Sequence, residues 1–387
     1  MKRIYFDNAA TTPLSQEVVD AMLPYMTEHF GNPSSIHAIG RETKNAIEQA
    51  RKTVAELLNA SPSEICFTSG GTESNNTIIK AAIRDLGVKN IVSSEIEHHC
   101  VLHAVENAEE KDNVKVYYVK LTENGRVNLE ELDKLLKNLQ GKTLVSLMHA
   151  NNELGNLLDI ERTSEICRDH GVYFHSDTVQ SVAHYKIDLQ KTPIHFITAS
   201  SHKFHGPKGA GMMYINGNLK IEPLFFGGSQ ERNMRAGTEN LYGIVGFGKA
   251  IELAYQNLEE DVKHIQGIKS YMIEKLQELN ANIEFNGDYN GQCLYTVLNV
   301  SFPPNDKNSM LLFNLDIAGI SASSGSACSS GSENESHVLQ AIKADPERAS
   351  VRFSFSKYNT KEEVDQVIEK IQELIPVNKD SIAIELN

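Results

Sequence analysis

The chain has 387 residues, of which 40% are hydrophobic and 23% charged, a composition typical of a globular protein long enough for two or three domains. Its formal net charge is −14 and its 37 Lys and Arg residues form no long basic stripe, which argues against nucleic acid as a direct ligand. Asp7 precedes any apolar stretch and no apolar run reaches bilayer length, so we expect no signal peptide, no membrane span and a cytoplasmic protein.

Between residues 61 and 216, short apolar runs alternate with helical patterns. Seven runs are expected as strands: 65–67, 90–92, 114–119, 144–148, 172–175, 196–199 and 211–215. This alternation predicts an α/β fold, a mostly parallel sheet covered by helices on both faces, with ligands beyond the carboxyl ends of the strands. Four polar runs follow such strand ends, and we expect the functional site there: 68–73, 149–152, 177–180 and 200–203.

The first polar run turns through Gly70 and Gly71 into a helix that is expected to continue to Arg84. Free amides at a helix start, beside residues small enough to let an anion approach, form a phosphate site. No Gly-Lys-Ser/Thr follows, so the run is not a Walker loop.

A histidine-rich stretch, 97–103, lies at an expected helix start. His99 and His103 are four residues apart and could share a helical face as metal ligands, but the HExxH order is absent and the sequence shows no third ligand. We therefore predict no metal site. We expect His98 to lie over an aromatic cofactor and move protons, and the other two to be surface or packing histidines.

Lys203 stands between His202 and His205, just after the expected strand 196–199. A lysine in a partly closed pocket can become an amine nucleophile, and pyridoxal phosphate is held by such a lysine while an acid pairs with its ring nitrogen. Asp177 is the candidate acid, and Gln180 could donate to the ring oxygen. The alternatives are a solvated loop lysine and an aspartate that only caps a helix.

The second half of the chain has a different pattern. A long helical stretch, 241–280, precedes a smaller α+β region whose expected strands are 283–285, 294–302 and 351–355, with helices near 307–316 and 361–374. The first dozen residues are expected to cross over to this region. We therefore predict a large domain over 15–260 and a small domain made of 1–14 and 261–387.

The chain has five cysteines, an odd number, and no two of them form a CxxC pair. This argues against a disulfide framework and a zinc knuckle. Cys66, Cys167 and Cys293 lie in strand-like or helix-like runs and are expected to be buried. Cys328 differs because the Ser/Gly-rich stretch around it, 321–332, has no apolar face to bury. We expect it in an exposed loop.

Seven motifs occur in order between Tyr5 and Phe355. They are Asp7-Asn8-Ala9-Ala10-Thr11-Thr12, Gly31-Asn32-Pro33-Ser34-Ser35-Ile36-His37, Thr68-Ser69-Gly70-Gly71-Thr72-Glu73-Ser74-Asn75-Asn76, Met148-His149-Ala150-Asn151-Asn152-Glu153-Leu154-Gly155, Ser200-Ser201-His202-Lys203-Phe204-His205-Gly206-Pro207-Lys208-Gly209, Arg235-Ala236-Gly237-Thr238 and Ser324-Gly325-Ser326-Ala327-Cys328. Together they resemble the cysteine desulfurases of the NifS/IscS type, in the class-V aminotransferase family. The resemblance implies a fold-type-I pyridoxal phosphate enzyme that works as a homodimer with its site at the subunit border.

The resemblance also implies a role for each matching residue. Lys203 matches the lysine that holds the cofactor, Asp177 the partner of the ring nitrogen, Gln180 the partner of the ring hydroxyl and His98 the stacking base. The remaining matches are the phosphate cradle (Gly71, Thr72, Ser200 and His202, with Thr238 from the other subunit), Asn152 near the ring oxygen and substrate carboxylate, Arg352 as the carboxylate clamp and Cys328 as the sulfur-accepting nucleophile. Two positions depart from the family pattern: Cys100, where alanine is usual, and the run 354–357.

The implied reaction converts L-cysteine to L-alanine and leaves the sulfur on Cys328 as a persulfide, for a protein acceptor such as an iron–sulfur scaffold. One alternative is an aminotransferase or another lyase on the same fold, because fold does not dictate chemistry. A second is a non-catalytic scaffold descended from such an enzyme.

Overall fold

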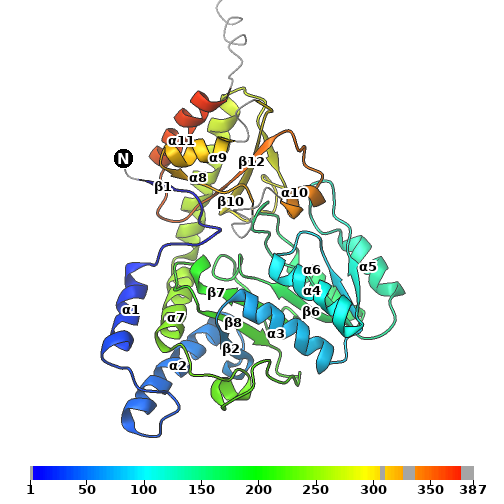
Figure 1. Cartoon of the computed structure of the whole chain (residues 1–387), viewed down its shortest axis with the longest axis vertical. Helices are drawn as coiled ribbons and strands as arrows, with labels where there is room; N and C mark the ends of the chain where they lie inside the picture. Colours follow the sequence, from blue (N-terminus) through cyan, green and yellow to red (C-terminus); the bar gives the residue numbers. More distant parts are fainter. Residues whose placement is uncertain (1–2, 306–309, 326–335, 376–387) are drawn as a thin grey trace, which may run out of the picture.

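The computed structural model describes residues 3–305, 310–325 and 336–375, which form a larger lobe and a smaller lobe above it in Figure 1. The larger lobe contains one seven-stranded sheet with the order β2-β8-β7-β6-β5-β3-β4, and only β8 runs antiparallel to its neighbours. The strands are β2 (Ile65–Thr68), β3 (Asn90–Ser93), β4 (Lys115–Tyr118), β5 (Thr143–Ser146), β6 (Tyr173–Asp177), β7 (Phe196–Ser200) and β8 (Gly211–Ile215). The predicted α/β fold is confirmed, with every expected strand present.

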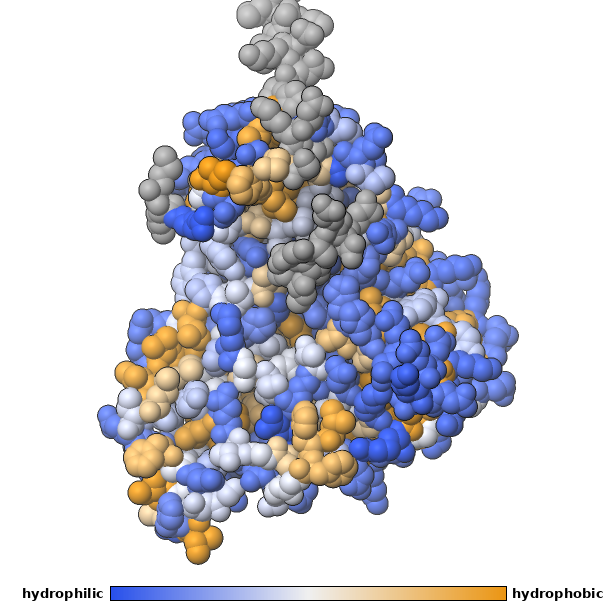
Figure 2. Space-filling view, viewed as in Figure 1, coloured by the Kyte–Doolittle hydropathy of each residue, from blue (hydrophilic) through white to orange (hydrophobic). Residues whose placement is uncertain are grey.

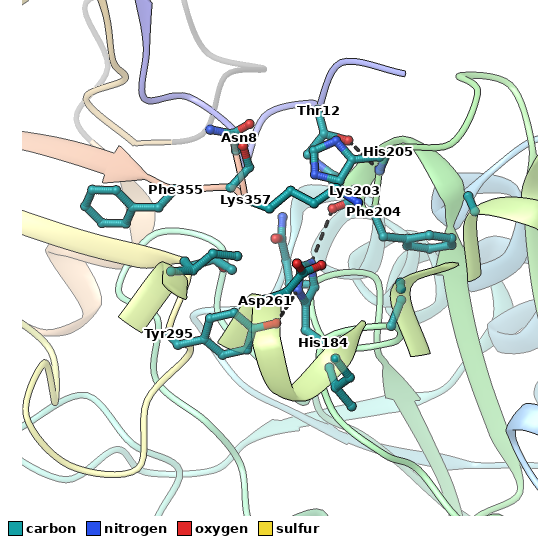
Figure 3. A pocket seen from close by; sticks show the side chains of 18 of the residues that line it. Asn8, Thr12, His184, Lys203, Phe204, His205, Asp261, Tyr295, Phe355 and Lys357 are labelled. Atoms are coloured by element: carbon teal, nitrogen blue, oxygen red, sulfur yellow. Dashed lines mark hydrogen bonds between the residues drawn. The ribbon is translucent and has the colours of Figure 1, made fainter. Parts of the chain in front are cut away.

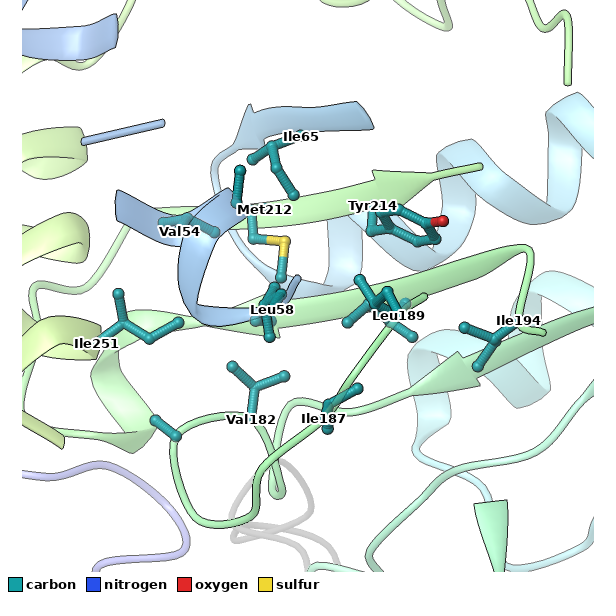
Figure 4. Close-up of a cluster of buried hydrophobic side chains, with 14 of the residues drawn as sticks. Val54, Leu58, Ile65, Val182, Ile187, Leu189, Ile194, Met212, Tyr214 and Ile251 are labelled. Atoms are coloured by element: carbon teal, nitrogen blue, oxygen red, sulfur yellow. The ribbon is translucent and has the colours of Figure 1, made fainter. Parts of the chain in front are cut away.

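Helices cover both faces of this sheet. They are α1 (Gln16–Thr27), α2 (Ala38–Leu57), α3 (Gly71–Arg84), α4 (His99–Asp112), α5 (Leu129–Asn138), α6 (Ile160–Asp169) and α7 (Leu241–Gln256). Successive side chains of a strand point to opposite faces of the sheet. Met212 and Tyr214 of β8 pack with α2 and α7 in the cluster of Figure 4, whereas Met213 packs with α3 and α4. The large core is therefore two apolar layers separated by the sheet.

The smaller lobe has its own sheet and core. Strands β12 (Ala349–Ser354), β10 (Val297–Phe302) and β9 (Glu284–Asn286) pair antiparallel in that order, beside α8 (Leu258–Glu278), α9 (Leu311–Ile317), α10 (His337–Ala341) and α11 (Lys361–Leu374). The N-terminal strand β1 (Ile4–Tyr5) pairs parallel with β11 (Ile320–Ser321). Phe6 packs edge-on against Phe353 and Phe355, with ring centroids 6.4 and 5.3 Å apart, so the expected crossing of the N-terminal residues is confirmed.

The expected helical stretch 241–280 consists of two helices that break at Asn257. Residues of α7 pack in the large core, and residues of α8 from Ile265 onward pack in the small core. This change of core supports the domain boundary near residue 260, which stays a proposal. Within the described part of the chain, no helix is both long and apolar enough to cross a membrane.

Candidate active site

A cavity of about 230 Å³ lies beyond the carboxyl ends of the parallel strands, between the lobes. Ten residues predicted from the sequence line it: Gly71, Thr72, His98, Asn152, Asp177, Gln180, Ser200, His202, Lys203 and Arg352. All but Arg352 come from the large lobe, and Arg352 enters from β12. The structure therefore brings together side chains that are as far apart in the sequence as positions 71 and 352, while their individual roles stay predictions.

Lys203 is the last residue of a short 3-10 helix, η2 (Ser201–Lys203), which follows β7. Its Nζ donates to the carbonyl oxygens of Ala9 and Ala10, at 2.6 and 2.9 Å. Gln180 Nε2 also donates to the oxygen of Ala9, at 3.0 Å. The N-terminal segment thus lies across the lysine and fixes its amine at the cavity wall, which disfavours the interpretation as a solvated loop lysine.

A second, smaller cavity adjoins Lys203 on the other side (Figure 3). There His184 Nε2 lies 3.3 Å from the carbonyl oxygen of Lys203, and its Nδ1 lies 2.9 Å from the Tyr295 hydroxyl. Burial lowers the pKa of His184 to about 4. A neutral histidine therefore links the backbone of Lys203 to the small lobe.

Asp177 ends β6 with 5% of its surface exposed. Its Oδ2 accepts from Asn75 Nδ2 at 2.7 Å, and its Oδ1 accepts from the Val179 amide at 2.9 Å. Asn75 is held in turn by Thr198 Oγ1, which donates to its Oδ1 at 3.0 Å. The carboxylate is therefore fixed in the cavity wall, where it can face a cation or a protonated ring nitrogen.

His98 is the N-cap of α4, as expected for a histidine at a helix start. The Cys100 amide donates to its Nδ1 at 3.1 Å, so in the neutral ring the proton is on Nε2. Burial lowers the pKa of His98, while the nearby Asp177 carboxylate opposes and the Lys203 ammonium reinforces that shift. The ring therefore presents one defined proton-carrying nitrogen to the cavity.

The start of α3 fits an anion. Its N-cap, Gly70, has no side chain to cap the first amides and adopts φ 151°. A Cβ on Gly71 would come within 2.6 Å of Val179 Cγ2, so only glycine lets the helix start lie this close to the loop after β6. Within the described residues, the first amides of α3 have no acceptor, and together with the helix dipole they favour a phosphate group.

Arg352 is 1% exposed and forms two charged or polar contacts. Its guanidinium donates to Asp7 Oδ1 at 2.8 Å and to the Asn152 carbonyl oxygen at 2.9 Å. Its Nε is buried and has no hydrogen-bond partner among the described residues. A buried donor left unpaired costs free energy, so this arginine has capacity for an anionic ligand in the cavity.

Glu97 precedes His98 and is 1% exposed. Its Oε1 accepts from Ser94 Oγ and from the Met148 amide, both at 2.8 Å, and its Oε2 has no partner among the described residues. Burial raises the pKa of Glu97 to about 8; those two hydrogen bonds oppose the shift and the Asp177 carboxylate adds to it. The side chain is therefore mainly a neutral acid at pH 7.

Two predicted residues do not line this cavity. Thr238 lines a different one together with Thr68, Ser69 and Arg235. Cys328 lies outside the described residues, and its role stays a prediction. Ser323, five residues before it, pairs through its backbone with Arg352, its N 3.2 Å from the Arg352 oxygen.

The other histidines of the 97–103 stretch pack against one another. The rings of His99 and His103 stack with centroids 5.1 Å apart, and His337 of the small lobe lies 4.4 Å from His99. Over residues 3–305, 310–325 and 336–375, no group of three histidine, cysteine or acidic side chains has the geometry to hold a metal ion.

Several contributors were missed in the sequence. Asn75 stands one helical turn after Gly71, so the helix period could have placed it on the cavity face. Asp7, Ala9 and Ala10 belong to the first of the seven motifs, but that motif did not indicate their contacts with Arg352 and Lys203, because they reach the site from the other end of the chain. Cys100 also lines the cavity, and burial raises the pKa of its thiol to about 12, so it stays protonated.

Comparison with known proteins agrees with this geometry. The sequence matches the aminotransferase class-V family over residues 4–367. It is 43% identical to the cysteine desulfurase IscS of Dictyoglomus turgidum, with 97% of this chain and 95% of that protein covered. It is 45% identical to the IscS of Methanosarcina thermophila, with 97% and 92% covered.

Solved structures show the same likeness. A NifS-like protein superposes with a TM-score of 0.88 at 38% identity, covering 96% of this chain and 98% of that one. SspA in complex with cysteine superposes with a TM-score of 0.79 at 32% identity, covering 92% and 100%.

Proposed function

The chain belongs to the cysteine desulfurases of the aminotransferase class-V family, and from that premise we propose that it converts L-cysteine to L-alanine and retains the sulfur as a persulfide on Cys328. The observation that carries the proposal is the single cavity that gathers Lys203, Asp177, His98 and Arg352. A lysine, an acid, an imidazole and an arginine in one partly closed space are the groups needed to hold a cofactor, move a proton and bind an amino-acid carboxylate.

The family depends on pyridoxal phosphate, and the residues present fit this cofactor. Lys203 would hold its aldehyde and Asp177 its ring nitrogen. The start of α3 at Gly71 and Thr72, with Ser200 and His202, would hold its phosphate. Gln180 and Asn152 would face the ring oxygen, and His98 would lie against the ring. When bound, the cofactor supplies an electron sink for negative charge at the α-carbon of the substrate.

The chain's own residues then have separate tasks. Arg352 binds the substrate carboxylate, for which its Nε, without a partner among the described residues, is an available donor. Lys203 Nζ, released from the cofactor, takes the proton from the α-carbon. The Cys328 thiolate takes the substrate sulfur, so that one thiol and L-cysteine give one persulfide and L-alanine. The Nε2 of His98 is the candidate that exchanges a proton with a thiol in the cavity.

A homodimer is part of the proposal. Strongly exposed apolar side chains occur on the large lobe: Phe30 and Ile36, between α1 and α2, are 73% and 91% exposed, and Phe226, in the segment after β8, is 83% exposed. Figure 2 shows hydrophobic side chains gathered over α1 and α2, at the lower left of the view. A second subunit there would cover them, and Thr238, which is outside its own cavity, would serve the partner's site. The sulfur acceptor, an iron–sulfur scaffold or another carrier protein, and the cytoplasmic location stay predictions.

The test starts from the purified protein, which should be yellow. L-Cysteine is added, and alanine and sulfide are measured with a reductant present. Lys203→Ala should abolish the absorption of the bound cofactor together with turnover. Cys328→Ala should keep the colour and lose sulfur transfer.

Two outcomes would contradict the proposal. If Cys328→Ala still released sulfide at the original rate, the protein would be a lyase of another kind on the same fold. A colourless protein that gained no absorption on addition of pyridoxal phosphate would be a scaffold.

A further inference from the structure

A groove of about 680 Å³ lies between the lobes, lined by a different set of residues from the cavity at Lys203. Cys293 lines it and is half-buried, in the segment between β9 and β10. Its Sγ lies 3.2 Å from the Nζ of Lys269 on α8. The proposed sulfur transfer assigns no task to this thiol.

Lys269 is an unusual partner because it is only 4% exposed. Its Nζ donates to the Cys293 sulfur and to the Leu294 carbonyl oxygen, at 3.1 Å, and forms no ion pair with a carboxylate among the described residues. A buried ammonium needs a counter-charge. The Cys293 sulfur is in hydrogen-bond contact with the amine, and the Asp288 carboxylate acts on it from further away. Burial lowers the pKa of Lys269 and the nearby sulfur opposes that shift. The amine thus lies in hydrogen-bond contact with the sulfur, which itself lies 3.3 Å from the Tyr289 carbonyl oxygen, and it is placed to accept the proton of the thiol when the sulfur reacts.

A second observation points to a ligand in the same groove. His149 lines it, is 8% exposed, and its buried Nδ1 has no hydrogen-bond partner among the described residues. The groove also carries charges of both signs, with Asp159 and Glu161 on one element and Lys186 on another. It therefore offers an unsatisfied imidazole and a mixed-charge wall beside a nucleophilic sulfur, which suits a small zwitterionic molecule.

We propose that Cys293 is a modification site that reacts with small amino-acid disulfides, of which L-cystine is the simplest. The Cys293 thiolate attacks one sulfur of the disulfide and forms a new S–S bond, while the original S–S bond breaks. The departing thiolate takes the proton from the Lys269 ammonium, so a free thiol leaves and Lys269 remains as a neutral amine. The disulfide is the oxidant, and the products are a mixed disulfide on Cys293 and one molecule of thiol.

The test uses the full-length holoenzyme with Cys328→Ala, so that the predicted sulfur-accepting thiol does not compete. The protein is mixed with L-cystine at neutral pH, samples are quenched with acid, and modification of each cysteine is followed by peptide mass spectrometry. We expect Cys293 to react roughly fivefold faster in the folded protein than in the same protein unfolded in urea, because only the folded protein holds the Lys269 amine 3.2 Å from the sulfur, where it can accept the proton of the thiol. Cys66 and Cys167, which are 3% and 0% exposed, are the internal controls and should stay unmodified in the folded protein.

Lys269→Met should make Cys293 react no faster in the folded protein than in the unfolded one. Lys263→Met, on the exposed side of the same helix and outside the groove, should keep the faster reaction of the folded protein. Equal or slower reaction of Cys293 in the folded protein would overturn the proposal, and this comparison needs no lysine variant. Equal rates in Lys269→Met and the parent would overturn the assignment of Lys269. Neither outcome bears on sulfur transfer, because Cys328 is absent from every protein compared.

Discussion

At the scale of single residues, three buried polar groups stand out: one lines the cavity at Lys203, one precedes His98 in the chain and one lines the groove at Cys293. Arg352 Nε, Glu97 Oε2 and His149 Nδ1 are buried and have no hydrogen-bond partner among the described residues. Most buried polar groups in proteins are paired, so each unpaired group needs a reason. For Arg352 we predict that the reason is a ligand carboxylate. For Glu97 the pKa raised to about 8 keeps the carboxyl protonated at pH 7, so no unpaired charge is buried.

Glu97→Gln should change how stability depends on pH. In the folded protein the Glu97 carboxyl has a pKa of about 8, whereas in the unfolded chain it titrates near its ordinary value of 4.5. Between these values the folded state binds more protons than the unfolded state, so wild-type stability falls as pH rises. The Gln variant lacks this loss, and wild type should lose on the order of 3 kcal/mol relative to it between pH 5 and pH 8.

Urea unfolding of both holoenzymes at several pH values measures that difference. Parallel pH profiles for the two proteins would show that the Glu97 carboxyl is ionised in the folded state at pH 7. A constant offset between the profiles is acceptable, because the Gln amide places a donor where Oε2 has no partner.

Arg352→Lys should raise the KM for L-cysteine about tenfold to a hundredfold while the cofactor absorption is kept. Lysine preserves the charge but loses the planar fork, and with it one of the charge-assisted hydrogen bonds to a carboxylate. Steady-state kinetics on the coloured protein give the value. The control is Arg348→Lys, whose guanidinium contacts Ser301 outside the cavity and whose KM should stay unchanged. An unchanged KM in Arg352→Lys would remove Arg352 from the substrate site.

At the scale of elements, the strand-to-helix turn from β2 into α3 carries the predicted phosphate site. Gly71→Ala should weaken pyridoxal phosphate binding at least tenfold, because the added Cβ would come within 2.6 Å of Val179 and displace the helix start. Titration of the cofactor-free protein, followed by absorbance, measures this affinity. Gly267→Ala on α8 is the matched control, since its Cβ would meet nothing within 4 Å and should leave the affinity intact. Equal affinities in both variants would place the phosphate elsewhere.

Sequence patterns were sufficient for elements whose burial repeats along the chain. The buried strands β2, β3 and β5 to β8 are short apolar runs, and α3 has glycines at its start and a helical pattern up to Arg84. The break at Asn257 was missed because α7 and α8 are both helical and differ only in which core they contact. The periodicity of a sequence indicates which residues are buried, but it does not indicate which core a helix packs against.

In the candidate site, too, some residues could be predicted from the sequence and others could not. Lys203, Asp177 and Gly71 follow strand ends, so sheet geometry predicts that they converge. Asp7 and the carbonyl oxygens of Ala9 and Ala10 meet Arg352 and Lys203 through contacts that span most of the chain. The motif over residues 7–12 marks these residues but does not specify their contacts, because the contacts depend on how the N-terminal residues cross between the lobes.

At the scale of the whole molecule, the exposed apolar side chains of the large lobe lead us to predict a dimer interface. Phe226→Asp should shift the protein from dimer to monomer at micromolar concentration, because an aspartate at a covered position would bury an unpaired charge. If Thr238 of one subunit serves the other, the cofactor should be lost as the dimer dissociates. Sedimentation and cofactor absorbance, measured on the same dilution series, test both parts.

Phe313→Asp is the matched control. Phe313 is 56% exposed on α9 of the small lobe, away from α1 and α2, so this variant should keep the parent's dimer and colour at every concentration. If Phe226→Asp dissociated but kept all of its cofactor, cofactor binding would not depend on the dimer. Thr238 of the partner subunit would then not belong to the phosphate site. A parent protein that sediments as a monomer and still turns over L-cysteine would overturn the dimer itself, since each cavity would then be complete within one chain.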